Sequence, residues 1–134
     1  MKWYRYLISP DQWNNIPLMP TIRRYPGVAA LDNKIYVTGG YDGHEDLSSV
    51  DCYDPQNNTW SQVTNMKIAR FGHCLLNLHG LLYALGGYYN DGDDDQYINI
   101  CEVYDPDNGT ILHYELDFEM IGSAACLIKK YMIM

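Results

Sequence analysis

Two acidic segments carry the side chains of this sequence that could bind a cation or a basic partner. Residues 42–46 read DGHED and residues 90–95 read NDGDDD. Clustered carboxylates can ligate Ca²⁺, but the EF-hand order, with Gly sixth and Glu twelfth, is absent from both segments. A docking patch for a basic partner and a solvated acidic loop remain, and the solvated loop is favoured. The candidate partner contacts are Asp42, His44, Asp93, Asp94 and Asp95.

The other reactive side chains do not form a known catalytic set. The histidines are scattered over turns and strands, and Ser48 is the only serine near one of them. An active site requires a nucleophile with a base, a metal shell or paired acids that converge. The four cysteines include no CxxC pair, so neither a zinc site nor a redox motif is indicated. The sequence therefore predicts a non-enzymatic protein without a metal or cofactor, with buried thiols in a reducing compartment.

The charge of the chain excludes one class of partner. The 134 residues carry a net charge of −8 and only nine Lys and Arg, whereas nucleic-acid binding requires a basic surface. No run of residues is apolar over a membrane-spanning length, and the N-terminal segment has no apolar signal region. We therefore expect a cytoplasmic protein with neither a nucleic-acid nor a membrane partner.

A repeated unit must position these side chains. The run NKIYVTGGYDG at 33–43 returns as GLLYALGGYYNDG at 80–92. The same offset of 47 residues relates Trp13 to Trp60, Met19 to Met66, Arg23 to Arg70 and Tyr36 to Tyr83. After the second glycine pair, four inserted residues raise the offset to 51, which aligns YDP at 53–55 with YDP at 104–106. Several kinds of position that agree in one register indicate a structural repeat.

Each unit has the pattern of four short antiparallel strands. The apolar runs GVAAL and KIYVT are joined by Asp32 and Asn33, and CLLNL and LLYAL are joined by His79 and Gly80, as in two-residue hairpins. A third run ends at an Asp-Pro turn in each unit, and a fourth follows it. Four strands in about 47 residues is the period of one propeller blade. The fold class expected is all-β.

The string Met, three residues, Arg, apolar hairpin, Tyr, two residues, Gly-Gly, Tyr-Asp-Pro and Trp resembles the Kelch repeat of BTB-Kelch proteins. The resemblance covers nearly the whole chain and implies a partial Kelch β-propeller of about two four-stranded blades with flanking half-blades, not a closed ring. It implies the last two strands of a preceding blade at 1–17, repeats at 18–65 and 66–119, and a truncated start of a third repeat at 120–134. Abundant Ile, Asn and Tyr with few Arg resembles coding by an AT-rich genome, such as those of poxviruses that carry Kelch-like genes, some of them shortened.

Some repeated positions serve packing in this interpretation. A side chain at either glycine pair would hold neighbouring backbone or an aromatic ring away, and Tyr53 and Trp60 are expected to cover that site. The match weakens later, because Ile111 stands where Trp60 has its counterpart and Met134 stands where a third glycine pair is due. A weaker seam between blades is expected there. The structural repeat residues are Gly39, Gly40, Tyr53, Trp60, Gly86, Gly87 and Tyr104.

In BTB-Kelch adaptors, the connection between blades and the loop between strands two and three line the face that holds a substrate peptide. The resemblance makes Arg23, Arg24 and Arg70 candidate contacts, since Arg binds carboxylates bidentately, although pairing with the nearby acidic loops is the favoured alternative. Because equivalent propeller loops emerge on one face, the two acidic segments should adjoin.

The function implied is non-catalytic protein–protein interaction, similar to the substrate-binding part of cullin ubiquitin-ligase adaptors, with a host-interaction role if the chain is viral. Cullin binding is not expected, because in that family it belongs to a BTB domain that has no counterpart in this sequence. The partner would be a protein of unknown identity. The alternatives are a non-functional remnant of a longer Kelch protein and an actin-binding scaffold.

Overall fold

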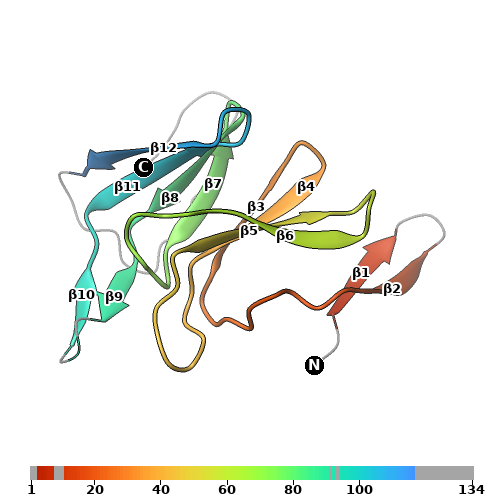
Figure 1. Ribbon diagram of the computed structural model, residues 1–134, viewed down its shortest axis with the longest axis horizontal. Coiled ribbons are helices and arrows are strands. Elements are labelled where there is room, and N and C mark those ends of the chain that lie inside the picture. The colour runs from red at the N-terminus through yellow and green to blue at the C-terminus, as the bar shows by residue number, and fades with distance from the viewer. Residues whose placement is uncertain (1–2, 8–10, 91, 93, 117–134) are drawn as a thin grey trace.

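The computed structural model describes residues 3–7, 11–90, 92 and 94–116. All regular elements in these ranges are β-strands, which confirms the predicted all-β class (Figure 1). No helix in the same ranges is long and apolar enough to cross a membrane. The segment predicted to begin a third repeat, 120–134, lies outside the described residues.

The first repeat forms a four-stranded antiparallel sheet in sequence order. Its strands are β3 (Gly27–Leu31), β4 (Lys34–Thr38), β5 (Ser49–Asp54) and β6 (Thr59–Asn65). The turn residues Asp32 and Asn33 both have positive φ, 49° and 59°, as the twist of a two-residue hairpin requires. The hairpin predicted for this pair is confirmed.

The second repeat forms an equivalent sheet of β7 (Cys74–Leu78), β8 (Leu81–Leu85), β11 (Ile100–Asp105) and β12 (Thr110–Glu115). Tyr53 lies opposite Trp60 in the first sheet, and Tyr104 lies opposite Ile111 in the second. Ile111 therefore takes the place of the tryptophan, as the sequence alignment predicted.

Two small hairpins accompany these sheets. The N-terminal hairpin pairs β1 (Trp3–Leu7) with β2 (Gln12–Ile16) and places Tyr6 opposite Trp13, as Tyr53 lies opposite Trp60. In Figure 1 it lies to one side of the two larger sheets, and the Arg5 guanidinium donates to the Pro55 carbonyl of the first repeat at 3.1 Å. The other hairpin pairs β9 (Tyr88–Asn90) with β10 (Asp95–Tyr97) and contains the four inserted residues, which sequence reasoning assigned to a plain surface loop.

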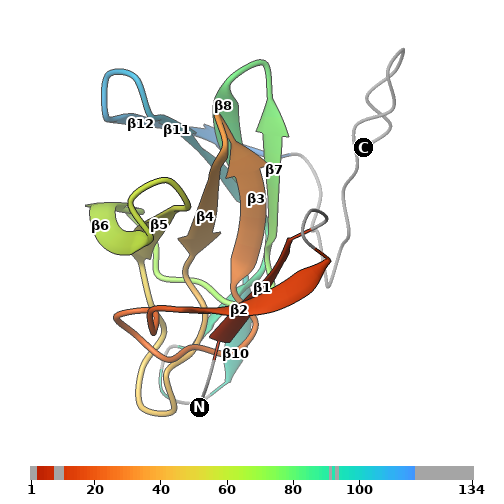
Figure 2. The ribbon, with the colours of Figure 1, turned by 90° about the vertical axis from the view of Figure 1, so that its right-hand side faces the viewer.

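The two larger sheets pack against each other with β3 and β7 side by side, like adjacent blades of a propeller (Figure 2). Their shared core contains Leu31, Tyr36, Val50, Cys52 and Met66 together with Leu75, Leu82, Ala84 and Tyr104. A second cluster, with Cys74, Leu85, Cys101 and Val103, lies on the other face of the second sheet. The prediction of buried thiols is confirmed for Cys52, Cys74 and Cys101, while Cys126 lies outside the described residues.

Glycine is required where the connection between the blades passes the end of β4. Gly39 has φ of 56°, and a Cβ atom there would clash with the carbonyl oxygen of Arg70. Gly40 has φ of 99° and donates its N–H to that same carbonyl, at 2.8 Å. These left-handed conformations and the close backbone approach both favour glycine.

The expectation that Tyr53 and Trp60 cover the glycine pair is wrong. Tyr53 lies opposite Ile35 of β4. Ile35 is four residues before Gly39, which directly follows the end of this strand. The atoms nearest to an added Cβ at Gly39 belong to Arg70, His73 and Met66 instead. The rings of Tyr53 and Trp60 pack against each other in a tilted arrangement, with 5.1 Å between centroids, and the Trp60 indole N–H donates to the Pro17 carbonyl at 3.1 Å. The aromatic pair therefore fastens the incoming chain to the blade.

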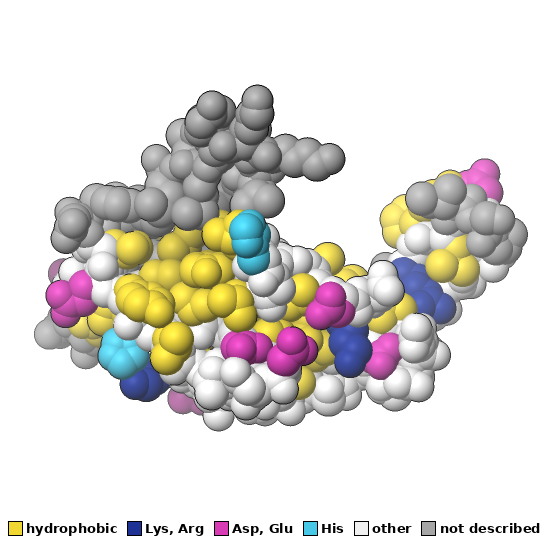
Figure 3. Space-filling model, turned by 90° about the horizontal axis from the view of Figure 1, so that it is seen from above, with side chains coloured by type: hydrophobic (Ala, Val, Ile, Leu, Met, Phe, Trp, Pro, Cys, Tyr) yellow, Lys and Arg dark blue, Asp and Glu magenta, His cyan; other side chains and the backbone are white. Residues whose placement is uncertain are grey.

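Figure 3 shows the molecule from above, on the side where the hairpin turns of the two sheets lie. Hydrophobic side chains gather in one patch on this face. The loops that follow the second strand of each sheet lie at the opposite end (Figure 1). The polar candidate residues of the sequence therefore gather away from this hydrophobic patch.

Candidate functional site

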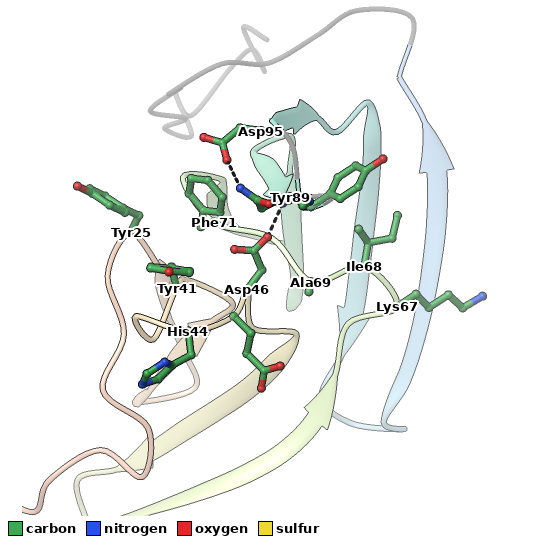
Figure 4. Close-up of a pocket in the computed structure, with 13 residues that line it drawn as sticks. Tyr25, Tyr41, His44, Asp46, Lys67, Ile68, Ala69, Phe71, Tyr89 and Asp95 are labelled. Atoms are coloured by element: carbon green, nitrogen blue, oxygen red, sulfur yellow. Dashed lines mark hydrogen bonds between the residues drawn. The ribbon is translucent and has the colours of Figure 1, made fainter.

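A groove of about 920 Å³ lies between the two blades, at the end where the acidic segments emerge. It is lined by Tyr25 and by residues from the loop 41–46, the connection 67–71 and the β9–β10 hairpin (Figure 4). These are the inter-blade connection and the loops between second and third strands. Both kinds of segment were predicted to share one face, and their common groove confirms that prediction.

Aromatic rings form a row along this face, with Phe71 at its centre. The ring centroid of Phe71 lies 6.4 Å from Tyr25, 6.5 Å from Tyr41 and 5.6 Å from Tyr88. Tyr88 continues the row to Tyr97 at 5.1 Å. Tyr25 is 66% exposed and Tyr97 is 48% exposed, so the row presents aromatic surface to solvent at both ends. We call these five residues the aromatic row.

The two acidic segments meet through Asn90. Its backbone N–H donates to Asp46 Oδ2 at 2.6 Å, and its side-chain amide donates to Asp95 Oδ1 at 3.2 Å. The predicted contact between the acidic segments is therefore confirmed. Asp46 Oδ1 is buried and has no hydrogen-bond partner among the described residues.

Asp42 shapes the first acidic loop from within. Its Oδ1 accepts the backbone N–H groups of His44 and Glu45 at 2.7 and 2.9 Å. These two hydrogen bonds, that of Glu45 first, lower the pKa of the Asp42 carboxyl. The carboxylate of Asp42 is consequently occupied in holding the turn that exposes His44 and Glu45 to the groove.

The other acidic candidates differ in their placement. Asp95 lines the groove and is exposed, and Asp94 is exposed beside it. Asp93 lies outside the described residues. Within the described ranges, no three His, Cys, Asp or Glu side chains lie close enough together to hold a metal ion.

Two of the three candidate arginines are buried in ion pairs. The Arg70 guanidinium donates to Glu102 Oε1 at 2.8 Å and to the carbonyls of Gly86 and Ile100 at 3.0 and 2.8 Å. Arg23 pairs in the same way with Asp51 and donates to the Gly39 carbonyl. Neither guanidinium faces the groove, whereas Arg24 is exposed.

These ion pairs were not predicted from the sequence. The arginines were expected to pair, if within the chain, with the acidic loops, but their partners Asp51 and Glu102 lie on the third strands. The signal was present, because each acid stands two residues before the repeated tyrosine, Tyr53 or Tyr104. An acidic side chain inside an otherwise buried strand requires a partner.

Glu102 also binds the backbone of the inter-blade connection, residues 67–71, that borders the groove. Its carboxylate accepts the backbone N–H groups of Lys67 and Ile68 at 2.7 and 3.1 Å. The pair of Arg70 and Glu102 thereby holds residues 67–70 against the second blade. Phe71, which follows directly, is positioned by this network.

His73 is another buried polar residue whose role was not predicted from the sequence. It is 6% exposed, and its Nε2 lies 2.7 Å from the Thr38 hydroxyl of the other blade. Burial, together with the charge of Arg70, lowers the pKa of His73 to about 3. The imidazole is thus neutral near pH 7 and belongs to the seam, not to a catalytic set.

Comparisons with known proteins agree with this architecture. A family model described as Kelch motif matches residues 22–67 and 69–110. Kelch-like protein 41 of Mus musculus is 39% identical over 83 residues, which cover 60% of this chain and 14% of that protein. Kelch-like protein 23 of Mus musculus is 39% identical over 107 residues, which cover 78% of this chain and 18% of that protein. The chain thus matches less than a fifth of either relative's length.

A solved structure, titled Structure of YjhT, has the same fold. It superposes with a TM-score of 0.79 at 16% sequence identity and covers 92% of this chain and 48% of that one. The similarity covers more of the chain than the two matched motifs do. From the repeated motifs, their two equivalent sheets and these matches, we conclude that the chain belongs to the Kelch-repeat family.

Proposed function

We propose that this chain is a non-catalytic protein–protein interaction module that holds its partner in the groove between the blades. Kelch repeats typically serve protein interaction, and the matched relatives are Kelch-like proteins. The observation that carries the proposal is the aromatic row, three of whose rings, Tyr25, Tyr41 and Phe71, line a groove built from four separate segments of two blades.

The composition of the groove supports a protein ligand. Aromatic side chains are enriched at protein interfaces, where they supply a large contact area at a small entropic cost. Carboxylates and amide groups at the rim add directional contacts. The volume of about 920 Å³ suits a peptide segment of the partner. The resemblance assigns cullin binding to a BTB domain, so the groove is proposed as a substrate-type surface only.

The test is a selection of binders from a displayed library of random peptides, followed by affinity measurement with groove variants. We expect Phe71→Ala to weaken the selected peptides at least about 10-fold, since truncating a central aromatic anchor commonly has this effect. Tyr25→Ala should weaken them less, because Tyr25 is largely exposed at an end of the aromatic row.

The control is Tyr114→Ala, which removes an exposed ring from β12, outside the groove lining. This variant should bind the selected peptides like the unaltered protein. Peptides that bind equally well to the Phe71 and Tyr25 variants, but lose affinity for the Tyr114 variant, would contradict a groove-centred function.

A further inference from the structure

We infer that the groove selects a basic segment of its partner, with an Arg or Lys side chain placed against the aromatic row and facing the rim carboxylates. The inference rests on the proposed function and adds the chemistry of the ligand. Charge complementarity and the location of the protein's own cations carry it.

The first step is the unbalanced charge of the lining. Glu45, Asp46 and Asp95 all line the groove. Lys67 is the only Lys or Arg among the described lining residues, and its Nζ lies 3.1 Å from His113 Nδ1 on β12. Figure 4 shows the Lys67 side chain directed away from the other lining residues. The groove therefore presents three carboxylates without a cation of its own between them.

The second step concerns the hydrogen bonds of these carboxylates. Asp46 accepts the backbone N–H of Asn90 through Oδ2, and its buried Oδ1 contributes negative charge without itself contacting a ligand. Asp95 is exposed and accepts the side-chain amide of Asn90 through its Oδ1. Carboxylates with unused acceptor capacity pair best with the fixed donor fork of a guanidinium or with an ammonium group.

The third step is the aromatic surface beside these carboxylates. Tyr41 and Phe71 line the same groove as Asp46, and all three are seen together in Figure 4. A cation placed over an aromatic face is attracted by the ring quadrupole, and an arginine side chain also stacks on the ring. The groove therefore offers aromatic faces on which the planar guanidinium of an arginine can stack and carboxylates that can pair with its charge.

An acidic partner would lack binding groups in this groove. The guanidinium groups of Arg23 and Arg70 are buried against Asp51 and Glu102. Arg24 is exposed but does not line the groove. A segment rich in Asp or Glu would therefore meet three carboxylates and, among the Lys and Arg of the described lining, only Lys67, whose side chain points away from the other lining residues.

The test uses the full chain and the displayed random library, and it scores the net charge of the enriched peptides. Enrichment of Arg and Lys among peptides that depend on Phe71 would support the inference. Groove-dependent peptides that are neutral or acidic would overturn it and leave the proposed function intact. Selected peptides that do not depend on Phe71 or Tyr25 would overturn both.

A quantitative arm uses one enriched Arg-containing peptide, labelled with a fluorophore, in an anisotropy titration. We expect Glu45→Gln and Asp95→Asn each to weaken binding about 3-fold, in line with the modest worth of solvent-exposed ion pairs. Raising NaCl from about 0.05 M to about 0.5 M should also weaken it, because exposed charge pairs are screened. In the Asp95→Asn variant the new carbonyl oxygen can still accept the Asn90 amide, so the fold of the hairpin is preserved.

The matched control is Asp107→Asn, which removes one exposed carboxylate from the turn between β11 and β12, outside the groove lining. It should leave the affinity unchanged. If Glu45→Gln and Asp95→Asn bind like Asp107→Asn, with no response to salt, the inference is wrong.

Discussion

His73 occupies a site made by three glycines and closed to solvent. An added Cβ atom at Gly27 or Gly39 would meet the imidazole ring, and one at Gly87 would lie 2.8 Å from the His73 Cβ. Only Thr38 reaches the ring from the opposite blade by a hydrogen bond among the described residues, while His73 Nδ1 has no such partner. A proton on this ring would therefore be buried near the positive Arg70.

Because of His73, the free energy of unfolding should decrease as the pH is lowered. The pKa of His73 is about 3 in the folded chain and near 6.5 when unfolded. Between these values the unfolded chain binds one more proton, so the free energy of unfolding decreases by up to about 1.4 kcal/mol for each pH unit below 6.5. Urea unfolding of the protein and of His73→Gln, measured from neutral to acidic pH, tests this expectation.

The His73→Gln variant should have a shallower pH dependence, since glutamine can still bond to Thr38 but does not titrate. His44→Gln serves as the control, because His44 is exposed in the acidic loop, and it should keep the original slope. Equal slopes for the protein and His73→Gln would contradict the assignment.

At the scale of elements, the two buried ion pairs, Arg23 with Asp51 and Arg70 with Glu102, fasten the chain segment that enters each blade to that blade. Arg70 bonds to the end of β8 through Gly86, to the start of β11 through Ile100, and to Glu102 within β11. One side chain thus joins the inter-blade connection to two strands, β8 and β11, that are distant from each other in sequence. Arg23 makes the equivalent contacts in the first blade, so the buried arginine and its ion pair are a feature of the repeat.

Removal of the Arg70 side chain should cost about 3–5 kcal/mol of folding free energy, because Glu102 would remain charged and buried without its partner. Arg24→Ala is the matched control, since Arg24 follows the equivalent arginine of the first repeat and is exposed, and it should change stability by less than about 0.5 kcal/mol. Chemical denaturation of both variants gives the comparison. Similar stabilities for Arg70→Ala and Arg24→Ala would show that the buried pair does not hold the connection.

The elements of the fold were predictable to the extent that their signals are local. The pairs Asp32 with Asn33 and His79 with Gly80 mark hairpins because few residue types accept positive φ. The β9–β10 hairpin was missed because its strands are only three residues long and polar. It is also held by a hydrogen bond from Asn90 to Asp46, which belongs to the other blade. The buried pairs of Arg23 and Arg70 were missed because their partners are distant in sequence, on the third strands.

At the scale of the whole molecule, the two blades share one core across their seam. Tyr36 of the first sheet and Tyr104 of the second meet edge to face at 6.3 Å, and Met66 of the connection is buried with them. Neither sheet therefore completes its core alone.

The poxvirus source suggested by composition stays a prediction, since no structural feature bears on it.

We therefore expect both blades to unfold in a single cooperative transition. Fluorescence of Trp60 on the outer strand of the first sheet, recorded in a variant with Trp3 and Trp13 replaced by Phe, and far-ultraviolet circular dichroism should give the same midpoint. This outcome would favour a maintained domain over a non-functional remnant. An aggregated or non-cooperative chain would favour the remnant, and co-sedimentation with filamentous actin would instead favour a scaffold.

The buried thiols report on two different openings of this molecule. Cys52 lies in the core shared by the blades, and Cys101 lies in the cluster on the far face of the second sheet. Burial raises the pKa of both thiols, that of Cys101 to about 11, so each reacts with an alkylating reagent only while its surroundings are open. The labelling rate of Cys52 therefore measures how often the seam parts, and that of Cys101 how often the far face opens. Their ratio distinguishes separation of the blades from loosening of one blade alone.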